Sequence, residues 1–443
     1  MVIAREYSPF TRATYRRAGN LAASAEGDQR MQHPAGPRKT GTVGATAIGV
    51  SAMLGAGVFS AFAPAAQAAG SWLLLSLGVA LVVAASNAAS TAQLARQHPG
   101  AGGVYLYGRE QLGEWPGFLA GWGFVIGKTA SVAAMAITAA AYLVPEPFAR
   151  PVALAVLVAV TAAGMLGITR TAAVATVIGS VVVAGLIGVL VVARVSPPLF
   201  GPADGDDAAF SAPGVLQGAG ILFFAFAGYA RVATLSEEVR DPRHTVPRAM
   251  LLSFLVVSTV LAALGWALLT TLGPGRLSHA PAPVAALVET QPVAVAAVSI
   301  LAAVSSIGAL SAVLAGSSRT AMAMGRQRDL PRLLARQHPS NAVPRVAVLA
   351  VAVGAALLIC LGDIREVIGF SSAGVLVYYL VANLSALTQG RSHRVVPRAV
   401  SVLGALGCIT LVVALPLPAL VSALGVLLLG VVLRVIAVRA RRN

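Results

Sequence analysis

The chain has 443 residues, of which 57% are hydrophobic and only 11% are charged. This balance excludes an ordinary water-soluble protein, in which about a quarter of the residues are charged. A formal net charge of +16 would otherwise suggest nucleic-acid binding, but the arginines lie between apolar runs rather than along one basic helix face. We therefore expect a lipid bilayer around the chain and no nucleic-acid partner.

Residues 1–41 are polar and rich in arginine, a composition typical of a flexible cytoplasmic tail rather than a cleaved signal peptide. From residue 42 onwards, apolar runs alternate with short polar segments, and a bilayer core needs about 20 apolar residues per helix. The sequence therefore predicts an all-α polytopic membrane protein with twelve transmembrane helices, followed by a basic cytoplasmic tail at 439–443. The expected helices are 42–68, 71–95, 115–144, 150–168, 172–194, 214–238, 248–272, 291–318, 344–362, 364–388, 397–415 and 417–438.

The distribution of Arg and Lys predicts the orientation in the membrane. With an even number of helices, both termini lie on the same side. The tails and loops on that side carry 26 Arg or Lys, whereas the opposite loops carry four, namely Arg150, Arg194, Arg276 and Arg365. Short loops rich in these residues remain in the cytoplasm. We therefore expect a multi-pass protein of the cytoplasmic membrane with both termini cytoplasmic.

The first and sixth expected helices contain glycines near their middles, at Gly55 and Gly57 in the first and at Gly228 in the sixth. Each glycine destabilises a helix interior by about 1 kcal/mol relative to alanine and allows the backbone to open. These two helices begin two five-helix halves, and the second half enters the membrane upside down because five is odd. We expect non-helical backbone from Gly55 to Val58 and from Phe226 to Tyr229. Interrupted helices at matching positions of inverted halves indicate a substrate site near the midplane. The two halves and the extra helices are expected at 42–194, 214–388 and 397–438.

An interrupted helix frees backbone N–H and C=O groups, which hydrocarbon cannot satisfy. A zwitterion such as an amino acid satisfies both kinds of group, because N–H groups bind a carboxylate and carbonyls bind an ammonium. The alternative is that the glycines serve only close packing between helices. The pairing of two interruptions favours a binding site.

Several segments of the chain form an ordered set of motifs. They are Gly55-Ala56-Gly57-Val58-Phe59, the segment Pro99 to Tyr107 (PGAGGVYLY), Gly121-Trp122, Phe223 to Tyr229 followed by Glu237-Glu238 and Asp241-Pro242-Arg243, and Ser318-Arg319 through Asp329-Leu330-Pro331. In this order they resemble the motifs of the amino acid permeases of the amino acid/polyamine/organocation superfamily. The resemblance spans nearly the whole membrane region.

The resemblance implies the leucine-transporter architecture, a 5+5 inverted repeat with helices one and six interrupted, plus two extra helices. It also implies that the substrate carboxylate meets N–H groups in the first interruption, that the ammonium meets carbonyls of both interrupted helices, and that Phe224 covers the substrate from outside. The N–H groups expected to bind are those of Ala56, Gly57 and Val58, and the carbonyls are those near Ala52, Phe223 and Ala225. The expected substrate-binding residues are Ala52, Gly55, Ala56, Gly57, Val58, Phe223, Phe224, Ala225, Ala227 and Gly228.

The chain departs from the family at the position of ion coupling. Many members carry a lysine in the fifth helix, whereas residues 172–193 contain no charge. Lys128 instead lies near the middle of the third helix, where an intramembrane charge indicates function, and its amine can bind and release a proton. We therefore expect Lys128 to couple transport to protons; the alternative is that it only lines a wet vestibule. The role of Arg231 is open between substrate path and structure, and Glu237 and Glu238 are expected to pair with loop arginines.

The central halves of the expected helices contain Lys128 and Arg231 but no Asp or Glu, so a cationic substrate would bring a positive charge without a buried partner. We expect a secondary active transporter for a neutral amino acid, with an acidic one second. Proton coupling is favoured, with sodium as the alternative ion. The other readings are an exchanger without ion coupling, a membrane enzyme and a transporter-like sensor. All six histidines lie in the tail or loops, so the sequence indicates no buried metal site, no cofactor and no catalytic residues.

Overall fold

The computed structural model describes residues 40–98, 103–167, 172–195, 209–233 and 239–439. Within these ranges the regular structure is helical, apart from an isolated parallel bridge between Thr40 and Val239. The bridge joins Thr40, two residues before the first helix, to the segment that follows the sixth expected helix. The described residues belong to one unit, which begins at Thr40.

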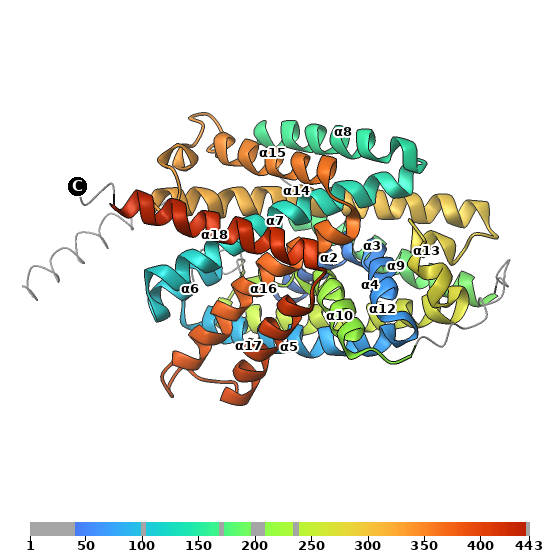
Figure 1. Ribbon diagram of the computed structural model, residues 1–443, viewed down its shortest axis with the longest axis horizontal. Coiled ribbons are helices and arrows are strands. Elements are labelled where there is room, and N and C mark those ends of the chain that lie inside the picture. The colour runs from blue at the N-terminus through green and yellow to red at the C-terminus, as the bar shows by residue number, and fades with distance from the viewer. Residues whose placement is uncertain (1–39, 99–102, 168–171, 196–208, 234–238, 440–443) are drawn as a thin grey trace, which may run out of the picture. The chain divides into compact units, whose positions relative to one another are not determined.

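The helices in the first part of the chain include three short segments, α3, α4 and α11, that result from interruptions of longer runs. They are α2 (Thr42–Met53), α3 (Gly57–Ser60), α4 (Phe62–Ala69), η1 (Gly70–Trp72), α5 (Leu73–Gln97), α6 (Gly103–Leu112), α7 (Glu114–Leu143), α8 (Glu146–Met165), α9 (Ala172–Val195), α10 (Ala212–Phe226) and α11 (Ala230–Ala233). Helices α7, α14 and α15 pack against one another, and α8 lies beside α15 along one edge of this unit (Figure 1).

The second part of the chain contains the longest helices. They are α12 (Pro242–Ser278), α13 (Pro283–Ala286), α14 (Pro292–Arg326), η3 (Arg332–Ala335), α15 (Arg345–Leu361), α16 (Ile364–Thr388), α17 (Arg398–Ala414) and α18 (Leu417–Arg439). Helices α12 and α14 extend beyond their expected ends at 272 and 318, because hydropathy marks where a helix leaves hydrocarbon and not where its hydrogen bonds stop. The chain bends inside α12 at Gly273, where φ is 71°, a backbone conformation that glycine adopts without strain.

The described residues contain nine helices long and apolar enough to cross a membrane, and three shorter apolar helices, α10, α15 and α17. The outer helices expose large apolar side chains; Leu428 of α18 and Val177 of α9, for example, are 63% and 61% exposed. Lipid tails solvate such a surface, whereas water would not. The chain is therefore a helical, multi-pass membrane protein.

Helices α7 and α16 pack closely through small residues. A Cβ atom on Gly127 would lie 2.9 Å from the carbonyl oxygen of Ser371, and one on Gly374 would lie 2.6 Å from the carbonyl oxygen of Gly123. Small residues allow such backbone approach inside membranes. Ser131 and Ser371 also share a hydrogen bond of 2.8 Å across this contact. The contact fixes α7, which carries Lys128, against α16.

One end of the helical unit is held by a buried carboxylate. Asp329, just after α14, accepts hydrogen bonds of 2.7 Å at Oδ2 from the hydroxyl of Tyr105 and from Arg109, both on α6. Its Oδ1 pairs with Arg434 of α18 at 3.0 Å. Burial, and then the hydrogen bond to Asp329, raise the pKa of the Tyr105 phenol, so the hydroxyl remains a donor. Two motifs more than 200 residues apart in the sequence thus meet at one side chain.

The guanidinium of Arg434 lies between two aromatic rings of α7, 4.5 Å from the ring centroid of Trp115 and 4.6 Å from that of Phe118. It also donates to the backbone carbonyl of Glu114 at 2.9 Å. A charge removed from water requires partners of this kind. The last helix is therefore fastened to α6, α7 and the end of α14.

Candidate functional site

Both helices expected to be interrupted are interrupted, with a small difference in each; the second break was predicted from Phe226 to Tyr229, but Phe226 is still helical. Helix α2 ends at Met53 and α3 begins at Gly57, so residues 54–56 are non-helical, whereas the sequence predicted a break from Gly55 to Val58. The carbonyl of Ala56 accepts from the N–H of Phe59 and restarts the helix two residues early. In the second helix, α10 ends at Phe226 and α11 begins at Ala230, which leaves residues 227–229 as a turn.

The two breaks lie directly against each other. A Cβ atom on Gly57 would lie 2.5 Å from the Cα of Ala225, and one on Gly228 would lie 2.3 Å from the carbonyl oxygen of Ala52. Neither contact leaves room for a side chain. Both glycines therefore have a packing role where the two broken helices meet.

The first break exposes a run of backbone donors. Among the described residues, the N–H groups of Gly55, Ala56, Gly57 and Val58 donate to no other protein group. These residues are all buried, with Ala56 and Val58 fully so. Buried N–H groups without an acceptor cost free energy unless a ligand or water satisfies them.

Backbone acceptors of both broken helices complement these donors. Beyond the hydrogen bonds within their own helices, the carbonyls of Ala52, Phe223 and Ala225 accept no hydrogen bond from another described protein group. The close contacts of Ala52 with Gly228 and of Ala225 with Gly57 place these carbonyls beside the breaks. The arrangement brings unpaired donors and these acceptors into one buried region, as the binding of a zwitterion requires.

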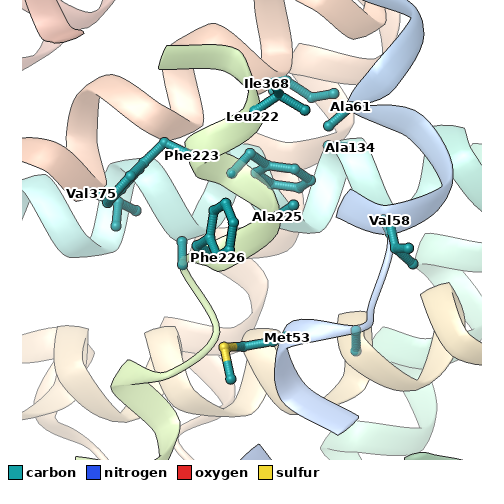
Figure 2. Close-up of a cluster of buried hydrophobic side chains, with 14 of the residues drawn as sticks. Met53, Val58, Ala61, Ala134, Leu222, Phe223, Ala225, Phe226, Ile368 and Val375 are labelled. Atoms are coloured by element: carbon teal, nitrogen blue, oxygen red, sulfur yellow. The ribbon is translucent and has the colours of Figure 1, made fainter. Parts of the chain in front are cut away.

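The side chains around the breaks are apolar and come from both broken helices, α7 and α16 (Figure 2). They include Met53, Val58, Ala61, Ala134, Leu222, Phe223, Ala225, Phe226, Ile368 and Val375. Phe223 packs edge-to-face on Tyr379 of α16, with ring centroids 5.9 Å apart. Phe224, expected to cover the substrate, is 7% exposed. Besides these apolar contacts, the surroundings offer a bound molecule backbone polar groups, the Lys128 ammonium and the hydroxyls of Tyr229 and Ser305.

Lys128 reaches the second break. Its Nζ donates to the carbonyl oxygen of Ala227 at 3.2 Å and lies 5.9 Å from the ring centroid of Phe124. The side chain is 7% exposed, and among the described residues no carboxylate forms an ion pair with it. A buried ammonium is thus held mainly by a carbonyl that the interruption of α10 has set free.

Helix α14 contacts the first break through a residue that sequence reasoning missed. The Ser305 hydroxyl donates to the carbonyl of Leu54 at 2.5 Å, and both residues are buried. A Cβ atom on Gly55 would lie 2.6 Å from the Cβ of Ala309. In the sequence, the adjacent serines at 305 and 306 inside an apolar run could have indicated a polar contact here.

Arg231 lies in α11 just after the second break and is half-buried, and its N–H donates to the carbonyl of Gly228 at 3.0 Å. Glu237 and Glu238, expected to pair with loop arginines, lie outside the described residues. A separate groove of about 480 Å³, formed by α9 and α12, is lined by apolar residues and Arg194. None of the expected site residues lines it.

Comparison with known proteins identifies the family. The amino acid permease model matches residues 41–438. An uncharacterized transporter of Mycobacterium tuberculosis is 47% identical over 422 residues, which cover 92% of this chain and 93% of the relative. A branched-chain amino acid permease of Bacillus subtilis is 25% identical over 407 residues, 86% of each chain. The chloroplastic cationic amino acid transporter 7 of Arabidopsis thaliana is 27% identical over 402 residues, 83% of this chain and 69% of the relative.

The family model covers nearly all of the helical unit, and it includes both broken helices and Lys128. The relatives span most of this chain and carry the names of transporters and permeases. This chain therefore belongs to the amino acid permease family and is a membrane transporter of a small molecule such as an amino acid, not an enzyme.

Proposed function

We propose that this protein is a secondary active transporter that moves a neutral amino acid across the cytoplasmic membrane by alternating access. The observation that carries the proposal is made among the described residues. The N–H groups of residues 55–58 have no acceptor, and they lie close to the carbonyls of Ala52, Phe223 and Ala225, which accept no hydrogen bond beyond those within their own helices. The α-carboxylate binds the N–H groups and the α-ammonium binds the carbonyls. Gly55, Ala227 and Gly228 shape the two breaks, and Phe224 closes over the substrate.

The architecture in this proposal is a 5+5 inverted repeat with two extra helices. Among the described residues, nine helices long enough to cross a membrane and three shorter apolar helices are consistent with twelve spans. The first repeat runs from residue 42 to 194 and the second from 214 to 388. The broken helices α2–α3 and α10–α11 are then the first members of the two repeats. The excess of Arg and Lys on one side supports a cytoplasmic location for both termini.

The substrate side chain in this proposal is uncharged. A cluster of apolar side chains surrounds the breaks, and besides Arg231 of α11 the ammonium of Lys128 lies close to them. A substrate with a second positive charge would repel this ammonium in a medium of low dielectric constant. The branched-chain permease among the relatives handles neutral amino acids by name, whereas the Arabidopsis relative is named for cationic ones. The chemistry of this site favours the former class over the latter, with acidic amino acids second.

Proton coupling through Lys128 completes the proposal. The Lys128 ammonium bonds the carbonyl of Ala227 and so joins α7 to the second broken helix. Loss of the proton weakens this bond, because a neutral amine is a poorer donor than an ammonium. A difference in protonation between two conformations is the free-energy difference that coupling requires. Arg231, which keeps its charge, is assigned no step.

Uptake into proteoliposomes tests the proposal. Purified protein is reconstituted, and accumulation of labelled leucine, alanine, glutamate, arginine and putrescine is measured with and without an inward proton gradient, against protein-free liposomes. We expect saturable, gradient-driven accumulation of a neutral amino acid. Preferential transport of arginine or putrescine would refute the substrate class. Exchange without accumulation would instead favour the uncoupled exchanger.

A further inference from the structure

A single hydroxyl joins three elements at the end of α7 opposite Glu114. Tyr142 donates to the backbone carbonyl of Phe59 in α3 at 2.9 Å, and it accepts from the N–H of Val284 in α13 at 3.2 Å. The Tyr142 ring also packs edge-to-face on Phe59, with centroids 5.7 Å apart. We call Tyr142, Phe59 and Val284 the outer latch.

The three residues of the outer latch are buried. Tyr142 is 6% exposed, and Phe59 and Val284 are fully buried. Each of the two backbone groups therefore depends on the tyrosine hydroxyl, since a buried N–H or C=O without a partner is costly. The hydroxyl uses its donor and one acceptor position at the same time, so phenylalanine at this place would orphan two backbone groups while keeping the ring.

Helix α13 lies in the segment between α12 and α14, and this segment is buried rather than exposed to solvent. Val284, Leu287 and Val288 of this segment are at most 4% exposed, and α13 packs against α3. On its other side, Arg276 at the end of α12 forms an ion pair with Glu289. The loop is thus anchored twice, once to α12 and once, through Tyr142, to α3 and α7.

The anchored helix α3 begins with Gly57 and Val58, two of the residues whose N–H groups lack acceptors. Phe59, which holds the latch, is the next residue along. Movement of α3 away from α7 and α13 must break the bond to Phe59 or the bond to Val284, or both. The latch and the candidate site therefore share one rigid turn of helix.

We propose that Tyr142 is a positioning residue that locks α13 onto α3 and thereby closes the substrate site on the face opposite the arginine-rich loops. Release of the two bonds allows α13 to lift and opens a path from that face. The proposal rests on the proposed function for the orientation of that face and for the role of α3.

Cysteine accessibility tests the latch without requiring transport. Ser60→Cys places a thiol at the end of α3, in a background where the exposed Cys360 is replaced by alanine and Cys408, which is buried, is kept. A membrane-impermeant maleimide is applied to right-side-out and to inverted vesicles. Tyr142→Phe is compared with Tyr107→Phe, a matched control, because the Tyr107 hydroxyl is also buried but has no hydrogen-bond partner among the described residues.

Two lost hydrogen bonds of about 1 kcal/mol each correspond to about a 30-fold change in the ratio of open to closed forms. We expect Tyr142→Phe to raise the labelling rate of the cysteine at position 60 about 30-fold from the outer face and not from the inner face. In transport, KM should rise with little change in kcat, because substrate binding must close the site again. Tyr107→Phe should label at the parent rate.

Equal labelling of the Tyr142→Phe variant and its parent would overturn the latch, as would equal acceleration by Tyr107→Phe or acceleration from the inner face alone. Should Tyr142→Phe not yield folded protein, Glu289→Gln takes its place, because it removes the ion pair that anchors the α13 segment to α12. Faster labelling from the outer face would then support the latch, and an unchanged labelling rate would overturn it. Failure of the proposed function looks different. In that case the labelling result stands while no labelled amino acid is accumulated.

Discussion

Replacement of Lys128 by methionine separates proton coupling from binding. Methionine keeps an unbranched side chain of similar reach but removes the ammonium that donates to Ala227 at 3.2 Å. A hydrogen bond from a charged donor contributes about 1.5–3 kcal/mol. Burying a lysine at the centre of a membrane helix costs about 2.5–3.5 kcal/mol on insertion scales. The two magnitudes nearly cancel, so Lys128→Met should insert and fold about as well as the parent.

The same variant should nevertheless change the balance between conformations. If the bond to Ala227 is made in one facing state and not in the other, its loss shifts their ratio by about ten- to 150-fold. In proteoliposomes, Lys128→Met should still bind substrate and exchange it, but should fail to accumulate it under an imposed pH gradient. Lys128→Arg is the matched variant, because arginine keeps the charge and the donor yet does not release its proton. It too should lose accumulation.

Accumulation by Lys128→Met at the parent level under a pH gradient would refute this reasoning. A strict sodium requirement in the parent protein would direct the search for coupling to another site. Loss of binding as well as accumulation would contradict the separation argued above, and would place the amine in the substrate site itself.

Two further variants test the packing that supports the site. Gly228→Ala puts a methyl group 2.3 Å from the carbonyl oxygen of Ala52 and should destabilise the purified protein by about 1–3 kcal/mol in thermal unfolding. Gly78→Ala is the control, because its methyl group would meet nothing within 4 Å. Equal melting temperatures of the two variants would contradict the contact between the breaks. Asp329→Asn leaves Arg434 without its buried carboxylate partner and should lower the free energy of unfolding by about 3–5 kcal/mol, measured in the same way. A melting temperature equal to that of the parent would show that this cluster contributes nothing to stability.

The helix positions were predictable because hydrocarbon imposes long apolar runs. Helix α16 occupies the predicted range 364–388, and α15 and α17 begin and end within one residue of the prediction. The breaks were predictable in place but not to the residue. The sequence shows that Gly55 and Gly57 weaken the helix, but the resumption at Gly57 depends on the carbonyl of Ala56 finding the N–H of Phe59.

The contacts that give the site its chemistry were beyond the sequence, because they join distant residues. Lys128 could be recognised as a buried charge, yet its partner Ala227 lies 99 residues along the chain and contributes only a backbone carbonyl, which leaves no trace in residue type. Tyr142 likewise bonds backbone groups alone. Asp329 stood in a recognised motif, but only the fold shows that it meets Tyr105 of another motif.

Helix α7 carries both Lys128 and Tyr142, 14 residues or about 21 Å apart along the helix axis, and each side chain holds a different broken helix. Both bonds are made in the same conformation. A group biases an equilibrium only if its interactions differ between the states, so a coupling role for Lys128 requires that its bond be lost when the site opens.

Lys128→Met should therefore raise outer-face labelling of a cysteine at position 60, although the Lys128 side chain does not contact position 60. In the double variant with Tyr142→Phe, the two accelerations should multiply, as expected for sites too far apart to interact directly. Unchanged labelling in Lys128→Met would mean that the bond to Ala227 survives opening, and Lys128 could then hold the break in shape but could not drive its movement.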